Sequence, residues 1–536
     1  MKGVVVAPQP QAVEAGRAVL LKDGNAIDAA IATALVQGIV DPMNAGIGGF
    51  GCIQVYSSSK DEVKAISFHG EVGSKASPEV FAEDVVGQIA GHAERFSVKD
   101  DVNQIGYKSV TLPGVVRGFW EAHSRFGRIS WEELFQPAIH LARDGWTVEH
   151  HVWEAWHRVP DTGHRDARAR LNFSPYVRGI YTNDGEFLLP GTLLRNPDYS
   201  RSLERIAEGG VEVFYRGEIA DRIAEDLSDN GGFVTKADLK GYRAEVTDPV
   251  STEYRESKVT SVPLPASGGQ LIQLLKIVEG FDLSDIGFLS SKYVDILART
   301  MQIIFRDRAL YLGDPKFIEV PQTRLLSESY IEECQDLIRR REVIQVPKLT
   351  ALKEGRNTTH TTVIDGEGNV CTLTHTLGSC SGIATPGLGF MYNNAMYQFH
   401  PLPGNPNSIS PGKRRLTGIA PTIVWKEAQP YMALGAPGGT KIFCGIFQVI
   451  LGVIDFGLTL AEAVSAPRLY IDSDELRLEA RIYFALKKVL EAGGWKLKYM
   501  KSYDNFFSLV QSALKDEDRI IGASDPRGGG GVAELT

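Results

Sequence analysis

The sequence predicts a mixed α/β (α+β) fold built as one structural domain, and three observations lead to this prediction. Two runs of β-forming residues flank Gly366-Glu367-Gly368, the pattern of a hairpin between neighbouring strands. The segment 25–40 is rich in alanine and isoleucine, which predicts a helix that is buried all round. No linker, repeat or low-complexity stretch divides the 536 residues, although length alone would suggest several domains.

The predicted hairpin pairs the strand that begins near Thr358 with the strand that ends at Thr376. Its loop contains Gly366 and Gly368, a pair expected to supply the positive φ angles of a three-residue loop. If the strands pair symmetrically about Glu367, Thr358 lies opposite Thr376 and two hydroxyl groups meet across the ladder. A slip of one residue would separate them.

The remaining elements are predicted from hydrophobic periodicity and turn residues. Helices are expected at 11–21, at 25–40, within 115–143, at 271–279, at 293–310 and at 440–454. Strands are expected at 52–56, 63–68, 389–392, 421–425 and 431–435. Residues 150–260 are expected to alternate short helices with polar loops. The mostly polar segment 339–356 is expected to be exposed enough to move.

The composition is that of a chain able to bury a sizeable core. Hydrophobic residues make up 43% and charged residues 23%, with a net charge of −9, which argues against nucleic acid and anionic membrane as partners. The longest apolar stretch, Phe443 to Ile454, is shorter than the roughly 18 residues of a membrane span. The N-terminal apolar run is too short for a secretory signal, so a gene product that starts here is expected to be cytoplasmic.

Cysteines and histidines give no sign of a metal or other cofactor. Five cysteines are few and unpatterned, which suits reduced thiols, and no CxxC or HExxH spacing occurs. His150, His151 and His157 resemble a metal cluster, but Trp153 and Trp156 between them favour a half-buried helix face. We therefore predict that the protein has no metal site there and needs no cofactor.

Thr358 has a chemistry that other strand threonines lack if it becomes an N-terminus. A free α-amine titrates at about 7.7–8, so part of it is an unprotonated base at neutral pH and can take the proton of its own hydroxyl. Such an amine requires cleavage between Asn357 and Thr358. The hydroxyl of Thr358 could attack the carbonyl of Asn357 and give an ester that water opens. Because threonine is favoured in strands, the segment taken alone also fits plain sheet.

Gly438 and Gly439 precede the helix expected at 440–454. Backbone N–H groups at the start of a helix point outward at the positive end of its dipole, which suits the oxyanion of a tetrahedral intermediate. The alternative is a glycine turn that only lets a strand and a helix pack closely.

Motifs along nearly the whole chain identify a family. They are, in order, Asp23–Ala30, Gly48–Gly51, Leu112–Phe119, Pro137–Ile139, Leu141–Gly145, Pro265–Gly269, the Thr358 segment, Ala436–Gly439 and Gly522–Arg527. In these stretches and their order the sequence resembles the γ-glutamyltransferase family of N-terminal-nucleophile (Ntn) hydrolases, which contains γ-glutamyl transpeptidases and related acylases.

The resemblance implies a four-layer αββα sandwich and assigns roles to particular residues. Thr358 would be the nucleophile with its amine as base, Thr376 would orient the amine, and Gly438 and Gly439 would form the oxyanion hole. Cleavage between Asn357 and Thr358 would give a large chain, 1–357, and a small chain, 358–536, that stay together in one domain. Whether the processed heterodimer forms a homodimer stays open.

The substrate-binding positions depart from those of the transpeptidases. Those enzymes hold the γ-glutamyl carboxylate with an arginine and two serines, and its amine with an asparagine, an acidic or amide residue and an aspartate. An alignment through Lys75-Ala76-Ser77 places Pro78 at the arginine. The other corresponding positions carry Thr417, Gly418, Gly378, Ala395 and Gln398. Losing a bidentate arginine and its companions would weaken glutamyl recognition by several kcal/mol.

The segment from His400 to Arg415 resembles a shortened form of the lid of those enzymes. A short lid would admit water and favour hydrolysis over transfer, and its prolines predict a stiff loop. The available cations for an acidic acyl group are Lys75, Arg356, Arg414 and Arg415.

The sequence therefore predicts an autoprocessed amidohydrolase acting on a small-molecule amide, with an acyl group other than standard γ-glutamyl. Three alternatives stay open. They are a genuine γ-glutamyltransferase or glutathione hydrolase, an uncut and inactive relative of the fold, and a thiol hydrolase that uses Cys371 or Cys380.

Overall fold

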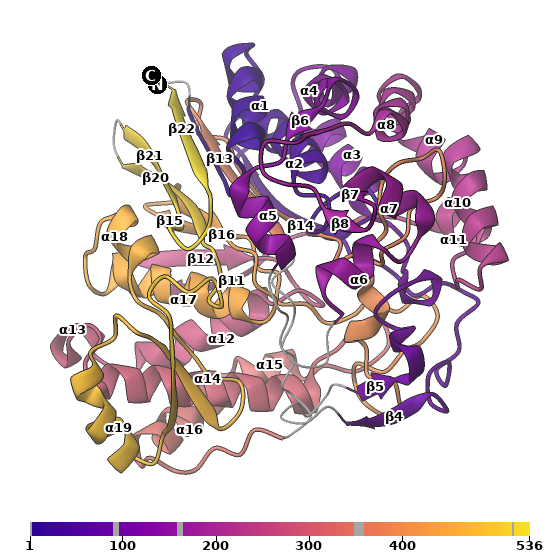
Figure 1. Ribbon diagram of the computed structural model, residues 1–536. Helices are drawn as coiled ribbons and strands as arrows, with labels where there is room; N and C mark the ends of the chain where they lie inside the picture. Colours follow the sequence, from indigo (N-terminus) through magenta and orange to yellow (C-terminus); the bar gives the residue numbers. More distant parts are fainter. Residues whose placement is uncertain (1–2, 89–95, 158–164, 348–357, 517–518, 536) are drawn as a thin grey trace.

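Two β-sheets packed face to face form the centre of the computed structural model (Figure 1), which describes residues 3–88, 96–157, 165–347, 358–516 and 519–535. The first sheet has the strand order β10 (Glu245–Thr247), β3 (Glu62–Phe68), β2 (Phe50–Ser57), β14 (Val370–Thr376), β13 (Thr359–Asp365), β1 (Gly3–Ala7) and β22 (Gly531–Leu535). The second has the order β11 (Val250–Tyr254), β12 (Ser257–Ser261), β15 (Thr422–Lys426), β16 (Gln429–Gly435), β20 (Gln511–Asp516) and β21 (Arg519–Ser524).

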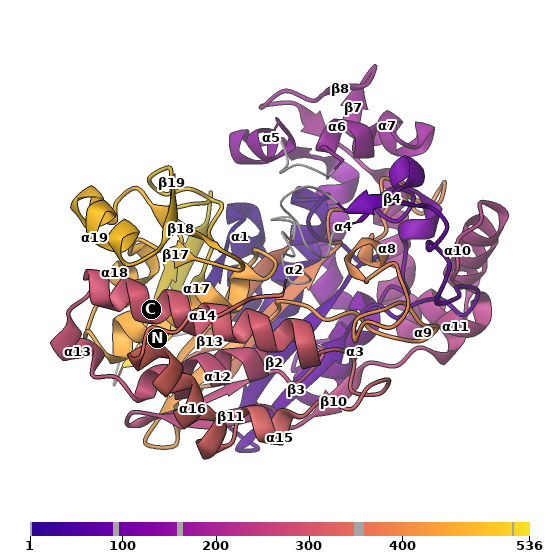
Figure 2. The same cartoon turned by 90° about the horizontal axis from the view of Figure 1, so that it is seen from below.

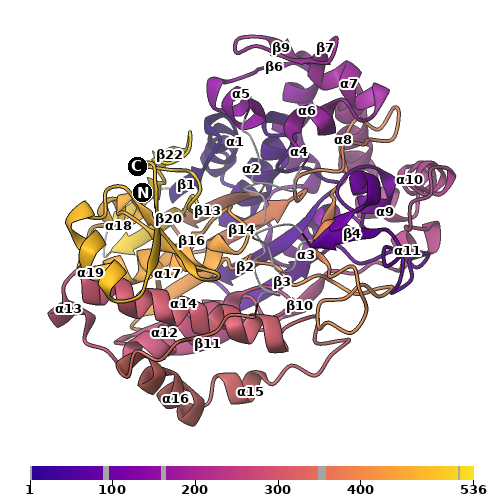
Figure 3. The ribbon, with the colours of Figure 1, turned by 60° about the horizontal axis from the view of Figure 1, so that its bottom comes forward.

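Helices cover the outer face of each sheet (Figure 3). The first sheet is covered by α1 (Pro10–Leu21), α2 (Ala26–Val40), α3 (Val115–Phe126) and α4 (Trp131–Asp144). The second is covered by α12 (Gly268–Glu279), α14 (Ser291–Tyr311), α16 (Glu328–Arg339), α17 (Lys441–Ile454) and α18 (Leu460–Ser465). One apolar core lies under each helix layer and a smaller one lies between the sheets, which confirms the four-layer αββα sandwich.

Shorter elements surround this sandwich, and several project from one edge in Figure 2. Those between residues 85 and 241 are β4 (Val85–Gln88), β5 (Phe96–Val98), β6 (Trp146–Thr147), α5 (His150–His157), α6 (Ala167–Leu171), α7 (Pro175–Tyr181), β7 (Thr182–Asn183), β8 (Glu186–Phe187), β9 (Leu193–Leu194), α8 (Pro197–Gly209), α9 (Val211–Tyr215), α10 (Glu218–Asp229) and α11 (Lys236–Gly241). Those beside the second layer are α13 (Leu283–Ile286), α15 (Gln322–Leu325), β17 (Leu469–Tyr470), β18 (Glu475–Glu479), α19 (Lys487–Ala492) and β19 (Lys496–Met500). Short 3₁₀ turns lie at 99–101, 107–109, 395–398 and 484–486.

The helix α2 is buried along its whole length, as predicted. Asn25 caps it by accepting the N–H groups of Ile27 and Asp28, and the Asp28 carboxylate accepts the N–H of Asn25. Asp365 at the end of β13 also accepts the N–H of Ala26, at 2.9 Å. The start of α2 is therefore tied to the β13–β14 turn.

The β13–β14 hairpin has the predicted symmetric register, with Thr359 opposite His375. The predicted role of its glycine pair is wrong, because only Gly368 has a positive φ, at 87°. The Asp365 side chain stabilises the loop by accepting the N–H groups of Glu367 and Asn369, each at 3.0 Å. An Asx-type turn therefore closes the loop.

Residues on either side of the 357/358 junction contribute strands to both sheets. In the first sheet β13 lies between β14 and β1, and β1 also pairs with β22, so the two ends of the chain lie side by side. In the second sheet β12 pairs with β15 across the same junction. The two parts therefore share their hydrogen-bond ladders and their cores.

Most predicted elements agree with the structure within a few residues, but two predictions are wrong. Residues 389–391 follow a turn at 386–388 and form no strand, and Tyr392 makes one isolated bridge to Gly48, because Gly389 has a φ of 80° and packs against the backbone of Tyr199. The region 150–260 contains the sheet strands β10 to β12 besides helices. Among the described residues no helix is long and apolar enough to cross a membrane, and α17 lies in the core.

Candidate active site

Thr358 and Thr376 lie side by side at the end of the central hairpin. The Thr358 Oγ1 donates to the Thr376 Oγ1 at 3.2 Å, and the Thr376 Oγ1 accepts the backbone N–H of Gly378 at 2.8 Å. Both threonines are buried. The predicted juxtaposition of the two hydroxyl groups is present, and the Gly378 N–H fixes the position of the second one.

The alternation of β13 points Thr358 into the space between the two sheets. His360, two residues further, bonds to Thr374 at 2.7 Å and lies against Gly435 at the end of β16 in the other sheet. Burial lowers the pKa of His360 to about 3, so the imidazole is neutral. Thr358 therefore opens toward the segment that follows β16.

The other face of β13 is bonded to α2. Gln37 donates to Thr359 at 2.9 Å and accepts from Thr361 at 3.2 Å, and His375 Nε2 lies 3.1 Å from the Gln37 Oε1. Burial lowers the pKa of His375 to about 3. These hydrogen bonds fix the position of β13, which follows Thr358, relative to α2.

Gly438 and Gly439 form the turn between β16 and α17. Their φ angles are 138° and 64°, which only glycine adopts readily, and their carbonyls accept the N–H groups of Lys441 and Ile442 at 3.3 and 3.1 Å. The predicted strand–glycine–helix arrangement is present at the positive end of the α17 dipole. The turn follows the second sheet, and Thr358 lies on the face of the first sheet that is directed toward the second.

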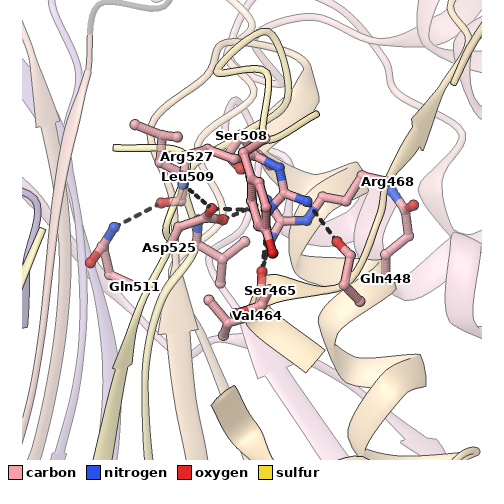
Figure 4. A network of polar contacts seen from close by, with 12 residues as sticks. Gln448, Val464, Ser465, Arg468, Ser508, Leu509, Gln511, Asp525 and Arg527 are labelled. Carbon is pink, nitrogen blue, oxygen red and sulfur yellow. Dashed lines mark hydrogen bonds and ion pairs between the residues drawn. The ribbon is translucent and has the colours of Figure 1, made fainter. Parts of the chain in front are cut away.

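A buried ionic network backs this turn (Figure 4). The segment 508–510 packs on it, since the Leu509 N–H donates to Pro437 O at 3.3 Å. Arg468 donates to Ser508 O and pairs with Asp525 at 2.7 Å, and Asp525 accepts the Val510 N–H at 3.0 Å. The position of the Gly438–Gly439 turn thus depends on charges that the sequence did not single out.

Gly378 and Gly418, two predicted substrate positions, have no room for a side chain. A Cβ at Gly378, whose φ is 75°, would lie 2.3 Å from the Asn394 Oδ1. A Cβ at Gly418 would lie 2.0 Å from the Gly439 carbonyl oxygen, so close packing of these two glycines places 418 at the candidate oxyanion turn. Asn394 fills the space beside Gly378 and accepts the Ser379 N–H at 2.8 Å.

The other predicted substrate positions line the same region less directly. Thr417 precedes Gly418, and its Oγ1 accepts the Ile419 N–H at 3.3 Å. Ala395 and Gln398 are buried in the 3₁₀ turn that follows Asn394, and the Gln398 amide donates to Tyr397 at 2.5 Å. No hydrogen bond from the described part of the chain joins Ala395 or Gln398 to Thr358.

Phe50 lies beside Thr376 and His69 lies beside Phe50, and neither residue was predicted to belong to the site. Phe50 is directly opposite Thr376 in the β2–β14 ladder, and its ring is 6.4 Å from that of His69. Pro78, which the alignment placed at the arginine position, lies instead in the turn that begins at Ser77. Phe50 and Thr376 are neighbours because β2 pairs with β14, although the two residues are more than 300 positions apart in the sequence. A sequence pattern does not reveal such a pairing.

The segment 400–415 is packed down by its own bonds. His400 and Ser408 form a bridge, the Lys413 ammonium donates to Pro406 O at 2.8 Å, and the Gly412 N–H donates to Val72 O at 2.8 Å. These contacts agree with a stiff loop. Arg356 and Asn357, a predicted cation and the predicted cleavage residue, lie outside the described residues, as does 348–356 of the polar approach segment.

The thiols and the α5 histidines have other surroundings than a reactive site. Cys371 and Cys380 are fully buried, and burial raises the pKa of both thiols, which keeps them protonated. The α5 histidines contact separate neighbours, namely Glu154 for His150, Glu149 for His151 and the Trp153 carbonyl for His157. Within the described ranges no three potential ligand side chains gather around one point.

Comparisons with known proteins agree with this fold. A family model described as "Gamma-glutamyltranspeptidase" matches residues 12–535. The Acylase ACY 1 proenzyme of Pseudomonas sp. (strain V22) is 35% identical over 501 residues, covering 92% of this chain and 87% of that protein. The Glutathione hydrolase proenzyme of Escherichia coli (strain K12) is 33% identical over 552 residues, covering 98% and 90%.

A solved structure extends the likeness to three dimensions. The crystal structure of cephalosporin acylase from Bacillus halodurans superposes with a TM-score of 0.86 at 27% identity, covering 100% of this chain and 96% of that one. The resemblance found in the sequence motifs is therefore confirmed over the whole chain.

Proposed function

Because this chain belongs to the γ-glutamyltranspeptidase family of Ntn hydrolases, we propose that it cleaves itself between Asn357 and Thr358 and then hydrolyses an amide through an acyl-Thr358 ester. The observation that carries the proposal is the 3.2 Å contact between the hydroxyl groups of Thr358 and Thr376 at the start of β13. A threonine nucleophile at that point needs a base, and its own free α-amine would supply one.

In the maturation step, the Thr358 hydroxyl attacks the carbonyl carbon of Asn357. The new C–O bond replaces the C–N bond, and the hydroxyl proton passes to the departing nitrogen, which becomes the α-amine. Water then hydrolyses the ester and leaves the Asn357 carboxylate. The large chain 1–357 and the small chain 358–536 stay together because both sheets contain strands of each.

In turnover, the amine takes the proton of the Thr358 hydroxyl as the oxygen attacks the substrate amide. The N–H groups at Gly438 and Gly439 stabilise the oxyanion, and removing one such donor typically raises the barrier by about 3–4 kcal/mol. The proton passes to the leaving amine, and water then hydrolyses the acyl ester. Thr376, fixed by the Gly378 N–H, orients the amine.

The acyl group proposed here differs from standard γ-glutamyl. Two positions where transpeptidases carry polar side chains are Gly378 and Gly418, and both are packed so closely that a Cβ does not fit. Relatives named as acylases match this chain at 35% identity, close to the 33% of the glutathione hydrolase relative. A genuine glutathione hydrolase is therefore the second candidate.

The maturation experiment is mass spectrometry of purified protein. We expect a small chain that begins Thr-Thr-His, no cleavage in Thr358→Ala, and retained cleavage in Thr358→Ser. A single uncut band from the unsubstituted protein would identify an inactive relative. Iodoacetamide inactivation together with an active Thr358→Ala variant would identify a thiol hydrolase instead.

The substrate experiment offers the mature enzyme a panel of amides and reads the mass of the acylated small chain. Turnover of γ-glutamyl-p-nitroanilide that glycylglycine accelerates would support the second candidate and exclude the proposed acyl group. A mature enzyme that acylates Thr358 with other acids and leaves γ-glutamyl-p-nitroanilide intact is the expected result.

A further inference from the structure

The carboxylate of Asp41 directly follows α2, the helix that packs on β13 and β14 at the outer face of the first sheet (Figure 1). It is buried and accepts two side-chain amides, those of Gln9 and Asn44, each at 2.8 Å. Burial raises the pKa of Asp41, while the Asn44 bond, the nearby His151 and the Gln9 bond lower it. No step of the proposed reaction uses this buried charge.

Gln9 connects Asp41 to the residue that follows the nucleophile. Because the Gln9 amide nitrogen donates to Asp41, its oxygen is free to accept from the Thr359 Oγ1, at 3.2 Å. The same oxygen accepts the Gln37 amide at 2.8 Å, and Gln37 also donates to Thr359 at 2.9 Å. The Thr359 hydroxyl is therefore held by two bonds whose direction depends on Asp41.

Asn44 connects Asp41 to the residue that follows Thr376. Its side-chain amide donates to the second Asp41 oxygen, and its backbone carbonyl accepts the N–H of Leu377 at 2.9 Å. The N–H groups of Asn44 and Ala45 close the turn by donating to the Asp41 carbonyl, at 3.0 and 3.1 Å. One buried side chain thus holds the residue after each threonine of the pair.

The charge of Asp41 also sets the direction of a longer row of hydrogen bonds. The Gln37 nitrogen donates to Gln9 and Thr359, so the Gln37 oxygen can only accept. That oxygen lies 3.1 Å from the His375 Nε2, which must therefore carry the imidazole proton. The His375 Nδ1 has no hydrogen-bond partner in the described part of the chain. A carboxylate at position 41 accepts only, whereas an amide there would allow the opposite direction.

We propose that Asp41 is a positioning residue for the reaction at Thr358. Through Gln9 and Asn44 it holds the residues that follow the two threonines, and so keeps their hydroxyl groups at the 3.2 Å contact. A misplacement of about 1 Å can slow an enzymatic reaction about 100-fold, so such a residue need not touch the substrate. The inference rests on the proposed acyl-Thr358 chemistry and adds a residue to it.

The first test is Asp41→Asn, which keeps the volume but cannot accept both amides. Self-cleavage should slow roughly 10- to 100-fold, measured by gel densitometry. In mature enzyme the probe is p-nitrophenyl acetate, an activated ester that needs little recognition, and acetylation of the small chain is followed by mass spectrometry. The limiting acetylation rate should fall by a similar factor at an unchanged half-saturating concentration, because the nucleophile is displaced and the binding surface is not.

The matched control is Asp307→Asn, in the second helix layer. Asp307 is fully buried and accepts the Gln273 amide at 2.7 Å and the Tyr330 hydroxyl at 2.8 Å, so this change also disturbs a buried polar network. It should lower stability in urea unfolding and leave both rates nearly unchanged. If Asp307→Asn slows the two reactions as much as Asp41→Asn does, the effect is one of general stability and the proposal is overturned.

A charge swap separates positioning from folding. In Asp41→Asn/Gln9→Glu the asparagine nitrogen can donate to the new carboxylate, and its oxygen can accept from Asn44. The other carboxylate oxygen accepts from Gln37 and Thr359 as before. The double variant should therefore recover most of both rates, whereas Gln9→Glu alone sets two carboxylates face to face and should not. A double variant that is as slow as Asp41→Asn, or that fails to mature as Asp41→Asn does, overturns the proposal.

The outcomes separate this inference from the function on which it rests. If the unsubstituted protein cleaves itself and is acetylated at Thr358, and Asp41→Asn equals it in both rates, the positioning role alone is overturned. An unsubstituted protein that neither cleaves itself nor accepts an acetyl group at Thr358 contradicts the proposed function, and the positioning role with it.

Discussion

The buried carboxylate of Asp525 offers the sharpest test of how the candidate oxyanion turn is held. It pairs with Arg468 at 2.7 Å and with Arg527 at 2.9 Å, and it accepts the N–H groups of Val510 and Arg527, each at 3.0 Å. The side chains of Asp525 and Arg527 are fully buried, and that of Arg468 is 2% exposed. We predict that Asp525→Asn strongly destabilises the protein.

The magnitude follows from the isosteric change. Asparagine keeps the volume of Asp525 but removes its charge and turns one acceptor into a donor. Arg527 keeps its ion pair with Glu479, whereas Arg468 loses the carboxylate with which it pairs at 2.7 Å. Breaking a buried ion pair in this way typically costs about 3–5 kcal/mol. Because an asparagine has one oxygen where the carboxylate has two, either the Val510 N–H or the Arg527 N–H loses its acceptor. The segment that supports the turn should therefore loosen, and self-cleavage should slow.

The assay is urea unfolding in a Thr358→Ala background, which keeps the protein as one chain, together with the rate of self-cleavage in the otherwise unsubstituted protein. The matched control is Asp248→Asn, since Asp248 pairs with Lys64 at 2.7 Å but is 82% exposed and should contribute under about 1 kcal/mol. If Asp525→Asn costs no more than Asp248→Asn, or leaves the cleavage rate unchanged, the reasoning is refuted.

Three further predictions address the hairpin and its surroundings. Gly378→Asn should lower stability by about 1–3 kcal/mol without creating γ-glutamyl turnover, because its Cβ would overlap Asn394; gain of that activity would contradict the packing argument. Thr376→Val should slow self-cleavage about 10- to 100-fold, measured by gel densitometry, since it removes the acceptor of the Gly378 N–H; an unchanged rate would exclude an orienting role. The folded-state pKa of His375 is depressed to about 3, so its contribution to stability is complete above the unfolded value of about 6.5 and is lost as pH falls below it. The stability gap between the unsubstituted protein and His375→Gln should therefore shrink by about 2 kcal/mol from pH 7.5 to 5, and a constant gap in urea unfolding would show that His375 is not buried as a neutral group.

Local features of the chain made parts of the fold predictable. The hairpin register follows from its turn and from alternation, and the buried helix from its composition, so Thr358 could be placed opposite Thr376 in advance. The strands β1 and β22 were missed because each is five residues long and pairs with the other from the opposite end of the chain. Position 389 was misread because only the packing on Tyr199 shows that its glycine turns.

The candidate site was predictable only as far as the pairing of Thr358 with Thr376 and the glycine turn before α17. Gly438 and Gly439 stand out as a glycine pair before a helix, but nothing in the sequence distinguishes Arg414 from Arg415. The structure separates them because neighbouring side chains point in opposite directions, one to Asp314 and the other to the Phe50 ring. Such a difference depends on segments far apart in sequence and therefore requires the fold.

Strands and connecting segments contribute different parts of the candidate site. Thr358 and Thr376 lie on paired central strands, where a substitution would disturb the ladder and two cores. Arg415 lies on the connection that leads to β15, outside the ladder hydrogen bonds of either sheet, so a substitution there would not disturb the pairing of the strands next to Thr358. Since both sheets contain strands from either side of the 357/358 junction, the paired threonines and these connecting segments would keep their relative position after a cleavage there only while both parts remain assembled.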